Sequence, residues 1–144
     1  MNIVVQSIYN NNFLFQKILE INTNSKIFSN EKKMIDKDII VSLQKILYNL
    51  NNYNYSVKII DIFYAFQWKK TFWNSPQDIE EIYSKIYEIL SKYNEEIKMD
   101  FEIILENTIE IKEIDFTSTT EEKLFILRLE IENNANSLEE CLDN

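Results

Sequence analysis

The sequence contains no glycine and no histidine, and it has only one proline and one cysteine. Without glycine, the glycine-rich phosphate loops of the Walker and Rossmann types are excluded. Any turn that needs a positive φ must then use Asn, Asp or a strained residue. Without histidine, a histidine general base, a Ser-His-Asp or Cys-His unit and a histidine metal ligand are also excluded. We therefore expect a protein that is not an enzyme and that uses no cofactor and no metal.

Paired cysteines and long apolar runs are absent as well. Cys141 has no second cysteine with which to form an internal disulfide or a zinc ribbon, so a reducing compartment is the simplest interpretation. No apolar run approaches the roughly 20 residues that span a bilayer. The start, MNIVVQSIYN, lacks the basic region of a signal peptide. These observations predict a cytoplasmic location and no membrane partner.

Charge is distributed unevenly along the 144 residues. Residues 1–94 carry nine acidic and eleven basic side chains, whereas residues 95–144 carry fifteen acidic and four basic ones. An asymmetry of this size indicates a polar partner or a solvating tail. Direct binding to nucleic acid is disfavoured, because the acidic part would repel phosphate.

The first half of the chain gives mixed signals. Residues 3–21 have apolar side chains at both helical and strand spacing, and we predict two strands joined by an Asn turn, with a helix over 13–21 as the alternative. Residues 36–51 have a helical apolar face, which Asp36 or Asp38 can cap. Residues 57–66 are rich in β-branched and aromatic side chains and predict a buried strand, with a buried helix as the alternative.

The clearest element is a helix over 76–94. Ser75 can cap it, Pro76 suits its first position, and Asp78 supplies an acidic group in the first turn. Apolar residues then recur at helical spacing: Ile79, Ile82, Tyr83, Ile86, Leu90 and Tyr93.

After residue 99 the period changes to two. Odd positions from Phe101 to Ile111 are mostly apolar and even positions mostly acidic, and the pattern flips after Lys112. Residues 125–132 alternate again, and the segment TSTTEE, which lies between the two alternating segments, is polar and predicts a loop. We infer two or three antiparallel strands with a strongly acidic outer face.

Together these patterns predict an α+β protein, a single domain over 1–144 in which an antiparallel sheet packs against two or more helices. Its net-acidic, β-rich part covers 95–132, and a tail at 133–144 is expected to be frayed or briefly helical.

The acidic face is the first candidate site. Alternate residues of a strand are about 6.6 Å apart, which is close to the spacing of successive phosphates, so such a face can mimic a nucleic-acid strand for a basic partner. The other interpretation is a solvated face that keeps edge strands from aggregating. The predicted contact residues are Asp100, Glu102, Glu106, Glu110, Glu130 and Glu132.

The aromatic segment FYAFQWKKTFWNSP, residues 63–76, is the second candidate. Its rings are expected mainly to fill a core and to close a helix. The alternative is an exposed aromatic patch made by Trp68, Phe72 and Trp73, with Trp68 the ring most expected to reach a partner. Stacking on single-stranded nucleic acid is disfavoured, because two lysines cannot dominate a net charge of −9.

An enzymatic alternative depends on carboxylates alone. Asp100 with Glu110 and Lys112 matches in outline the D…ExK arrangement of restriction-type nucleases, in which carboxylates hold Mg²⁺. The motif is weak, because ExK occurs four times in this lysine-rich, acidic chain.

The sequence therefore predicts a non-catalytic cytosolic inhibitor that binds and neutralises a basic protein that acts on nucleic acid, as toxin-immunity and phage anti-defence proteins do. It is expected to be a monomer or homodimer. The alternative is a structural or accessory subunit of a larger assembly.

Overall fold

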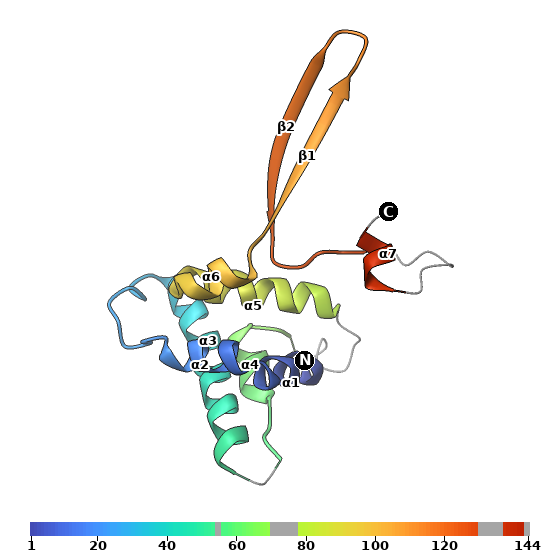
Figure 1. Cartoon of the computed structure of the whole chain (residues 1–144). Helices are drawn as coiled ribbons and strands as arrows, with labels where there is room; N and C mark the ends of the chain where they lie inside the picture. The colour runs from blue at the N-terminus through green and yellow to red at the C-terminus, as the bar shows by residue number, and fades with distance from the viewer. Residues whose placement is uncertain (54–55, 70–77, 130–136, 143–144) are drawn as a thin grey trace. The chain divides into compact units, whose positions relative to one another are not determined.

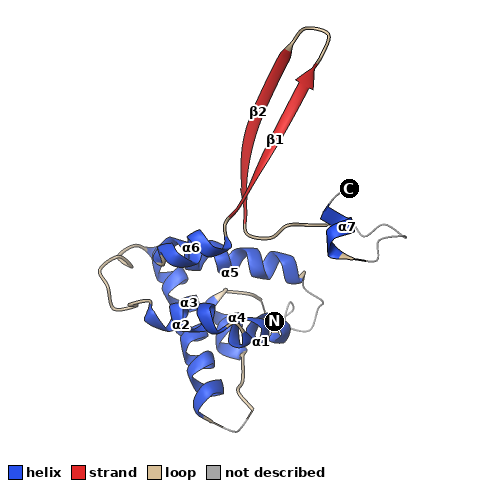
Figure 2. Ribbon diagram, viewed as in Figure 1, coloured by secondary structure: helices blue, strands red, loops and turns tan. Residues whose placement is uncertain are grey.

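The computed structural model describes residues 1–53, 56–69, 78–129 and 137–142, and its helices and two-stranded antiparallel sheet confirm the predicted α+β class (Figure 1). The chain divides into two compact units, Met1–Phe101 and Glu102–Asn144. The first is helical, and the second contains both strands (Figure 2). The prediction of a single domain stays a prediction. In the described residues, no helix combines the length and the apolar character that a membrane crossing requires.

The first 21 residues form two helices, α1 (Asn2–Asn10) and α2 (Asn12–Glu20), so the predicted pair of strands is wrong and the alternative helix is confirmed. Asn11 joins them in an extended conformation. Its Oδ1 atom accepts a hydrogen bond from the Leu14 amide at 3.0 Å, which caps α2. The apolar positions follow the helical period, since Val4, Val5 and Ile8 are all buried.

Helix α3 (Glu31–Asn52) contains the predicted helix over 36–51 but begins five residues earlier. Its cap is Asn30, which accepts a hydrogen bond from the Lys33 amide at 2.9 Å. The prediction that Asp36 or Asp38 caps this helix is therefore wrong. Asp36 instead lies in a buried position within it and accepts a hydrogen bond from the Tyr93 hydroxyl at 3.0 Å.

The predicted strand over 57–66 is also wrong, and the alternative of a helix is correct, because the chain forms α4 (Ile60–Ala65) there. Ile62 is fully buried, and Lys45 of α3 forms an ion pair with Asp61 of α4. The β-branched composition of the segment gave a strand signal that packing against α3 overrides.

Helix α5 (Ile79–Tyr93) confirms the predicted helix over 76–94 within the described residues. Its cap is Asp78, and Ser75 and Pro76 lie outside the described residues. Asn94 ends α5, and its Oδ1 accepts from the amides of Glu96 and Ile97, so it also starts α6 (Glu95–Phe101). Met99–Phe101 are therefore helical, where the alternating pattern predicted strand.

The buried hydrophobic core of the described residues belongs entirely to the first unit. Its fully buried side chains come from α1 to α6, and Ile21, Phe28 and Phe66 add to it from the segments next to the helices. They include Ile8, Leu14, Ile18, Ile39, Ile40, Leu43, Ile46, Leu47, Ile62, Ile86, Leu90 and Ile97.

The second unit contains β1 (Ile103–Ile111), β2 (Phe116–Leu124) and the short helix α7 (Leu138–Leu142). The strands pair without interruption from Ile103 opposite Leu124 to Ile111 opposite Phe116. The predicted loop over 117–122 is therefore wrong, because threonine and serine in this segment pair as a strand. The predicted strand over 125–132 is also wrong in its described part, residues 125–129, because β2 ends at Leu124.

Positive φ angles occur at two described residues, Gln67 (57°) and Asp115 (48°). Asp115 ends the turn between β1 and β2, as expected for a chain that has no glycine. Gln67 follows α4, and its positive φ is strained because its side chain is crowded in the left-handed region.

Candidate binding surface on the β-hairpin

The register of the hairpin sorts its side chains into two chemically different faces. Because side chains alternate along a strand, residues 104 to 110 at even positions share a face with residues 117 to 123 at odd positions. We define the acidic face by the carboxylates on this side, Glu106, Glu110 and Glu121, together with Glu102, which directly precedes β1 and contacts Lys123 of the same face. The opposite, apolar face contains Ile103, Leu105, Ile109, Ile111, Phe116 and Leu124.

Two carboxylates of the acidic face are placed directly opposite each other. Glu106 pairs with Glu121 in the ladder, and both side chains are exposed. Directly opposed Cβ atoms are about 5 Å apart, and like charges in such a pair destabilise a sheet. The next pair along the face is neutral, with the Thr108 and Thr119 hydroxyl oxygens 3.4 Å apart.

Glu102 differs from the other members of this face. Its carboxylate lies 3.1 Å from the Lys123 ammonium, and its side chain is only 17% exposed. In the part of the chain that the structure describes, no such ion pair involves Glu106, Glu110 or Glu121. The acidic face therefore presents three carboxylates whose charge no described lysine offsets by direct contact.

The spacing of these carboxylates differs from the prediction. Glu106 and Glu110 are four residues apart, with Thr108 between them, which corresponds to about 13 Å along the strand rather than about 6.6 Å. The closest pair lies across the strands, between Glu106 and Glu121. The sequence-based prediction omitted Glu121, because it assigned the segment TSTTEE to a loop. A second strand as long as β1, placed after a turn at residues 112–115, would have included Glu121.

The remaining predicted acidic residues lie elsewhere. Asp100 is exposed in α6 of the first unit, so it is not on the strands. Glu130 and Glu132 are outside the described residues.

The charge of the chain follows the boundary between the two units. Residues 1–101 contain twelve acidic and twelve basic side chains, whereas residues 102–144 contain twelve acidic and three basic ones. The net charge of −9 thus belongs to the second unit, and the first unit is neutral overall.

Trp68 completes the C-terminal cap of α4. The Gln67 amide donates to the Tyr64 carbonyl at 2.9 Å and the Trp68 amide to the Phe63 carbonyl at 3.2 Å, with Gln67 in the left-handed region. This is the Schellman arrangement, in which a side chain after the helix packs back on its last turn. The Trp68 ring does so, at 5.5 Å from Phe63 and stacked at 5.0 Å on Phe66.

Of the predicted aromatic patch, Trp68 is half-buried against the core. Phe72 and Trp73 lie outside the described residues.

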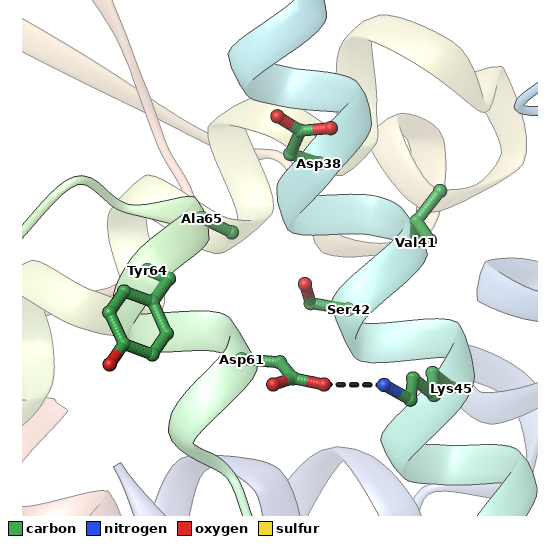
Figure 3. Close-up of a pocket in the computed structure, with 7 residues that line it drawn as sticks. All are labelled: Asp38, Val41, Ser42, Lys45, Asp61, Tyr64 and Ala65. Atoms are coloured by element: carbon green, nitrogen blue, oxygen red, sulfur yellow. Dashed lines mark hydrogen bonds and ion pairs between the residues drawn. The ribbon is translucent and has the colours of Figure 1, made fainter.

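The first unit has a pocket of about 370 Å³ between α3 and α4, lined by Asp38, Val41, Ser42, Lys45, Asp61, Tyr64 and Ala65 (Figure 3). The Lys45 ammonium lies 2.5 Å from the Asp61 carboxylate, so its charge is already matched (Figure 3).

A second pocket of about 330 Å³ is bordered by Lys32, Lys85 and Lys92 together with Asp36 and Glu88. Its charges are also matched in part, because Lys92 lies 2.8 Å from Glu88 and this hydrogen bond lowers the pKa of the Glu88 carboxyl. Neither pocket gathers the unmatched charge that the acidic face does.

The residues that the structure describes contain no group of three His, Cys, Asp or Glu side chains that could hold a metal ion. The residues of the nuclease-like motif are divided between the units, with Asp100 in the first and Glu110 in the second.

No protein-family model matches the chain, and no curated protein shows significant similarity to it.

Proposed function

We propose that this chain is a non-catalytic protein that binds a basic protein through the acidic face of its hairpin. The observation that carries the proposal is the directly opposed pair Glu106 and Glu121, on a unit that holds the whole net charge of −9. In the free protein, this pair of like charges destabilises the hairpin. A lysine or arginine of a partner, placed between the two carboxylates, removes the destabilisation.

The charge distribution also supports a fast and selective encounter. A unit with twelve acidic and three basic residues attracts a basic protein over long range, which raises the association rate and makes it depend on salt. Close charge pairs at interfaces contribute roughly 1.5 to 7 kcal/mol of coupling where they are well desolvated.

The partner class follows from the same chemistry. Proteins that act on nucleic acid present lysine and arginine to phosphates, and an acidic face with hydroxyl groups between its carboxylates competes for those side chains. We therefore propose a cytosolic inhibitor of the toxin-immunity or anti-defence type, monomeric or homodimeric when free.

The experiment is affinity capture from a lysate of the source cell, with the full chain as bait. The test variant is Glu106→Gln/Glu121→Gln. The matched control is Glu31→Gln/Glu81→Gln, which removes two exposed charges from the first turns of α3 and α5. We expect wild type and control to retain one basic protein that the test variant loses and that salt releases. Equal capture by the test variant would overturn the proposal.

A second candidate function, an accessory subunit of a larger assembly, is favoured by the apolar face. Ile109 and Phe116 of this face are 64% and 49% exposed. Association through such a face would tolerate salt and would fail in the variant Ile109→Thr rather than in Glu106→Gln/Glu121→Gln.

A further inference from the structure

Strand β1 has an edge whose protection against pairing with another chain is limited to the negative charges of Glu106 and Glu110. It runs for nine residues in unbroken register, and its sequence, IILENTIEI, contains no proline and no lysine. Natural proteins protect edges with short strands, bulges, prolines and charged side chains, especially lysine, and an acidic edge still admits a strand that carries cations. In the described residues the sheet has only two strands, so this edge faces no third strand.

A hairpin of two strands is also marginally stable by itself in water. Most of its side chains, including Ile104, Ile109 and Ile111, are exposed. A third strand would therefore add both backbone hydrogen bonds and buried apolar area.

The two edges of the hairpin differ chemically. Along β1, the acidic side chains Glu106 and Glu110 lie on one face, and Leu105, Ile109 and Ile111 lie on the other. Along β2, the apolar face is interrupted by Ser118, Thr120 and Glu122. The apolar face of β1 is interrupted only by Asn107, so β1 offers an added strand a more apolar side than β2 does, with Glu106 and Glu110 on the other side.

A second copy of this chain fits the β1 edge poorly. If two β1 strands pair antiparallel with matching faces, the carboxylates of Glu106 and Glu110 lie on the same face as those of the copy, and like charges repel. If the register shifts by one residue, the acidic face of one copy continues into the apolar face of the other. Charge complementarity therefore selects a strand that carries cations.

We propose that a strand of the basic partner adds antiparallel to the β1 edge, with lysine or arginine opposite Glu106 and Glu110. Apolar side chains of the same strand lie opposite Leu105, Ile109 and Ile111. This inference rests on the proposed function, and it adds the binding mode and a sequence pattern: two basic residues four positions apart, flanked by apolar residues on the opposite face.

The test uses two synthetic nine-residue peptides of identical composition with the full-length protein. The in-register peptide has lysines opposite Glu106 and Glu110, valines opposite Leu105, Ile109 and Ile111, and threonines elsewhere. In the shifted peptide, each lysine exchanges places with the neighbouring valine, the one opposite Leu105 or Ile109. This exchange places the lysines on the apolar face. Binding is measured by NMR titration, together with hydrogen exchange of the backbone amides of β1 and β2.

We expect the in-register peptide to bind roughly tenfold more tightly than the shifted one, since two cross-strand ion pairs and the apolar pairs are lost together. In the complex, every second amide of β1 gains protection from exchange, and the edge of β2 does not. Protection on β2, or no binding of either peptide, overturns strand addition.

The two proposals fail in different ways. If both peptides bind equally, and Glu106→Gln/Glu121→Gln abolishes both interactions, then the acidic face binds cations but strand addition is wrong. If the in-register peptide binds and the capture experiment yields no basic protein, the edge pairs with strands but the proposed function is wrong.

Discussion

Glu106 and Glu121 lie directly opposite each other in the antiparallel ladder, with both carboxylates exposed. Replacing one of them tests how much this arrangement costs. Glu121→Thr is expected to stabilise the hairpin by roughly 0.2 to 1 kcal/mol, because threonine favours strands and the like-charge pair is removed. Slower hydrogen exchange of β1 amides in the free protein measures the gain. The control Glu110→Thr removes a carboxylate that faces Thr117, and an equal gain there would contradict the explanation.

The cap of α4 gives a second prediction. Gln67 has a φ of 57°, which strains a residue with a side chain. Gln67→Gly is expected to raise the free energy of unfolding by roughly 0.5 to 1 kcal/mol, after allowance for the greater entropy of glycine in the unfolded chain. Urea unfolding measures the change. Gln67→Ala keeps the strain and should leave stability nearly unchanged; a gain in this variant would mean that the strain is not the cause.

The junction between α5 and α6 gives a third. Asn94 accepts hydrogen bonds from the amides of Glu96 and Ile97 at 3.0 and 3.2 Å. Asn94→Ala is expected to cost about 1 kcal/mol in urea unfolding, which is typical of a lost helix cap. Asn94→Asp keeps an acceptor oxygen at the start of α6 and should restore most of the loss. If alanine and aspartate behave alike, the side-chain cap does not stabilise the junction.

Tyr93 predicts a loss of stability in base. Burial of its ring, with the hydrogen bond that its hydroxyl donates to Asp36, raises the pKa of Tyr93 from 10.0 to about 12. The unfolded state therefore loses this proton first as the pH rises. The stabilising effect is fully present below pH 10 and is lost between pH 10 and about pH 12.

Urea unfolding at several pH values checks this prediction. Burial also raises the pKa of Tyr87 to about 12, so the wild type loses stability from both groups. Tyr93→Phe should show a shallower loss with pH than wild type, and Tyr87→Phe provides the matched comparison. An unchanged slope in Tyr93→Phe would show that this phenol does not contribute.

Sequence reasoning succeeded where one period was dominant. The stripe through Ile82, Ile86 and Leu90 has helical spacing and few strand-like alternatives, and α5 forms as predicted. It failed at α1 and α4, since isoleucine, valine and aromatic residues favour strands locally and only packing in the tertiary structure makes them helical.

The candidate surface was predicted only in part. Alternation in β1 identified Glu106 and Glu110, because a period of two places them on one face. Glu121 was missed, since its strand is built of Thr, Ser and Glu, residues that also form loops. The pairing of strands, which brings Glu121 opposite Glu106, depends on the turn length and on contacts distant in sequence.

Asn11 and Asn94 connect consecutive helices with φ angles of −91° and −146°, a region open to every amino acid. Because no junction is built from glycine, the denatured polypeptide has fewer backbone conformations to surrender when it folds. The chain therefore loses less backbone entropy on folding, and part of its free energy of unfolding comes from this property of the unfolded state rather than from native contacts.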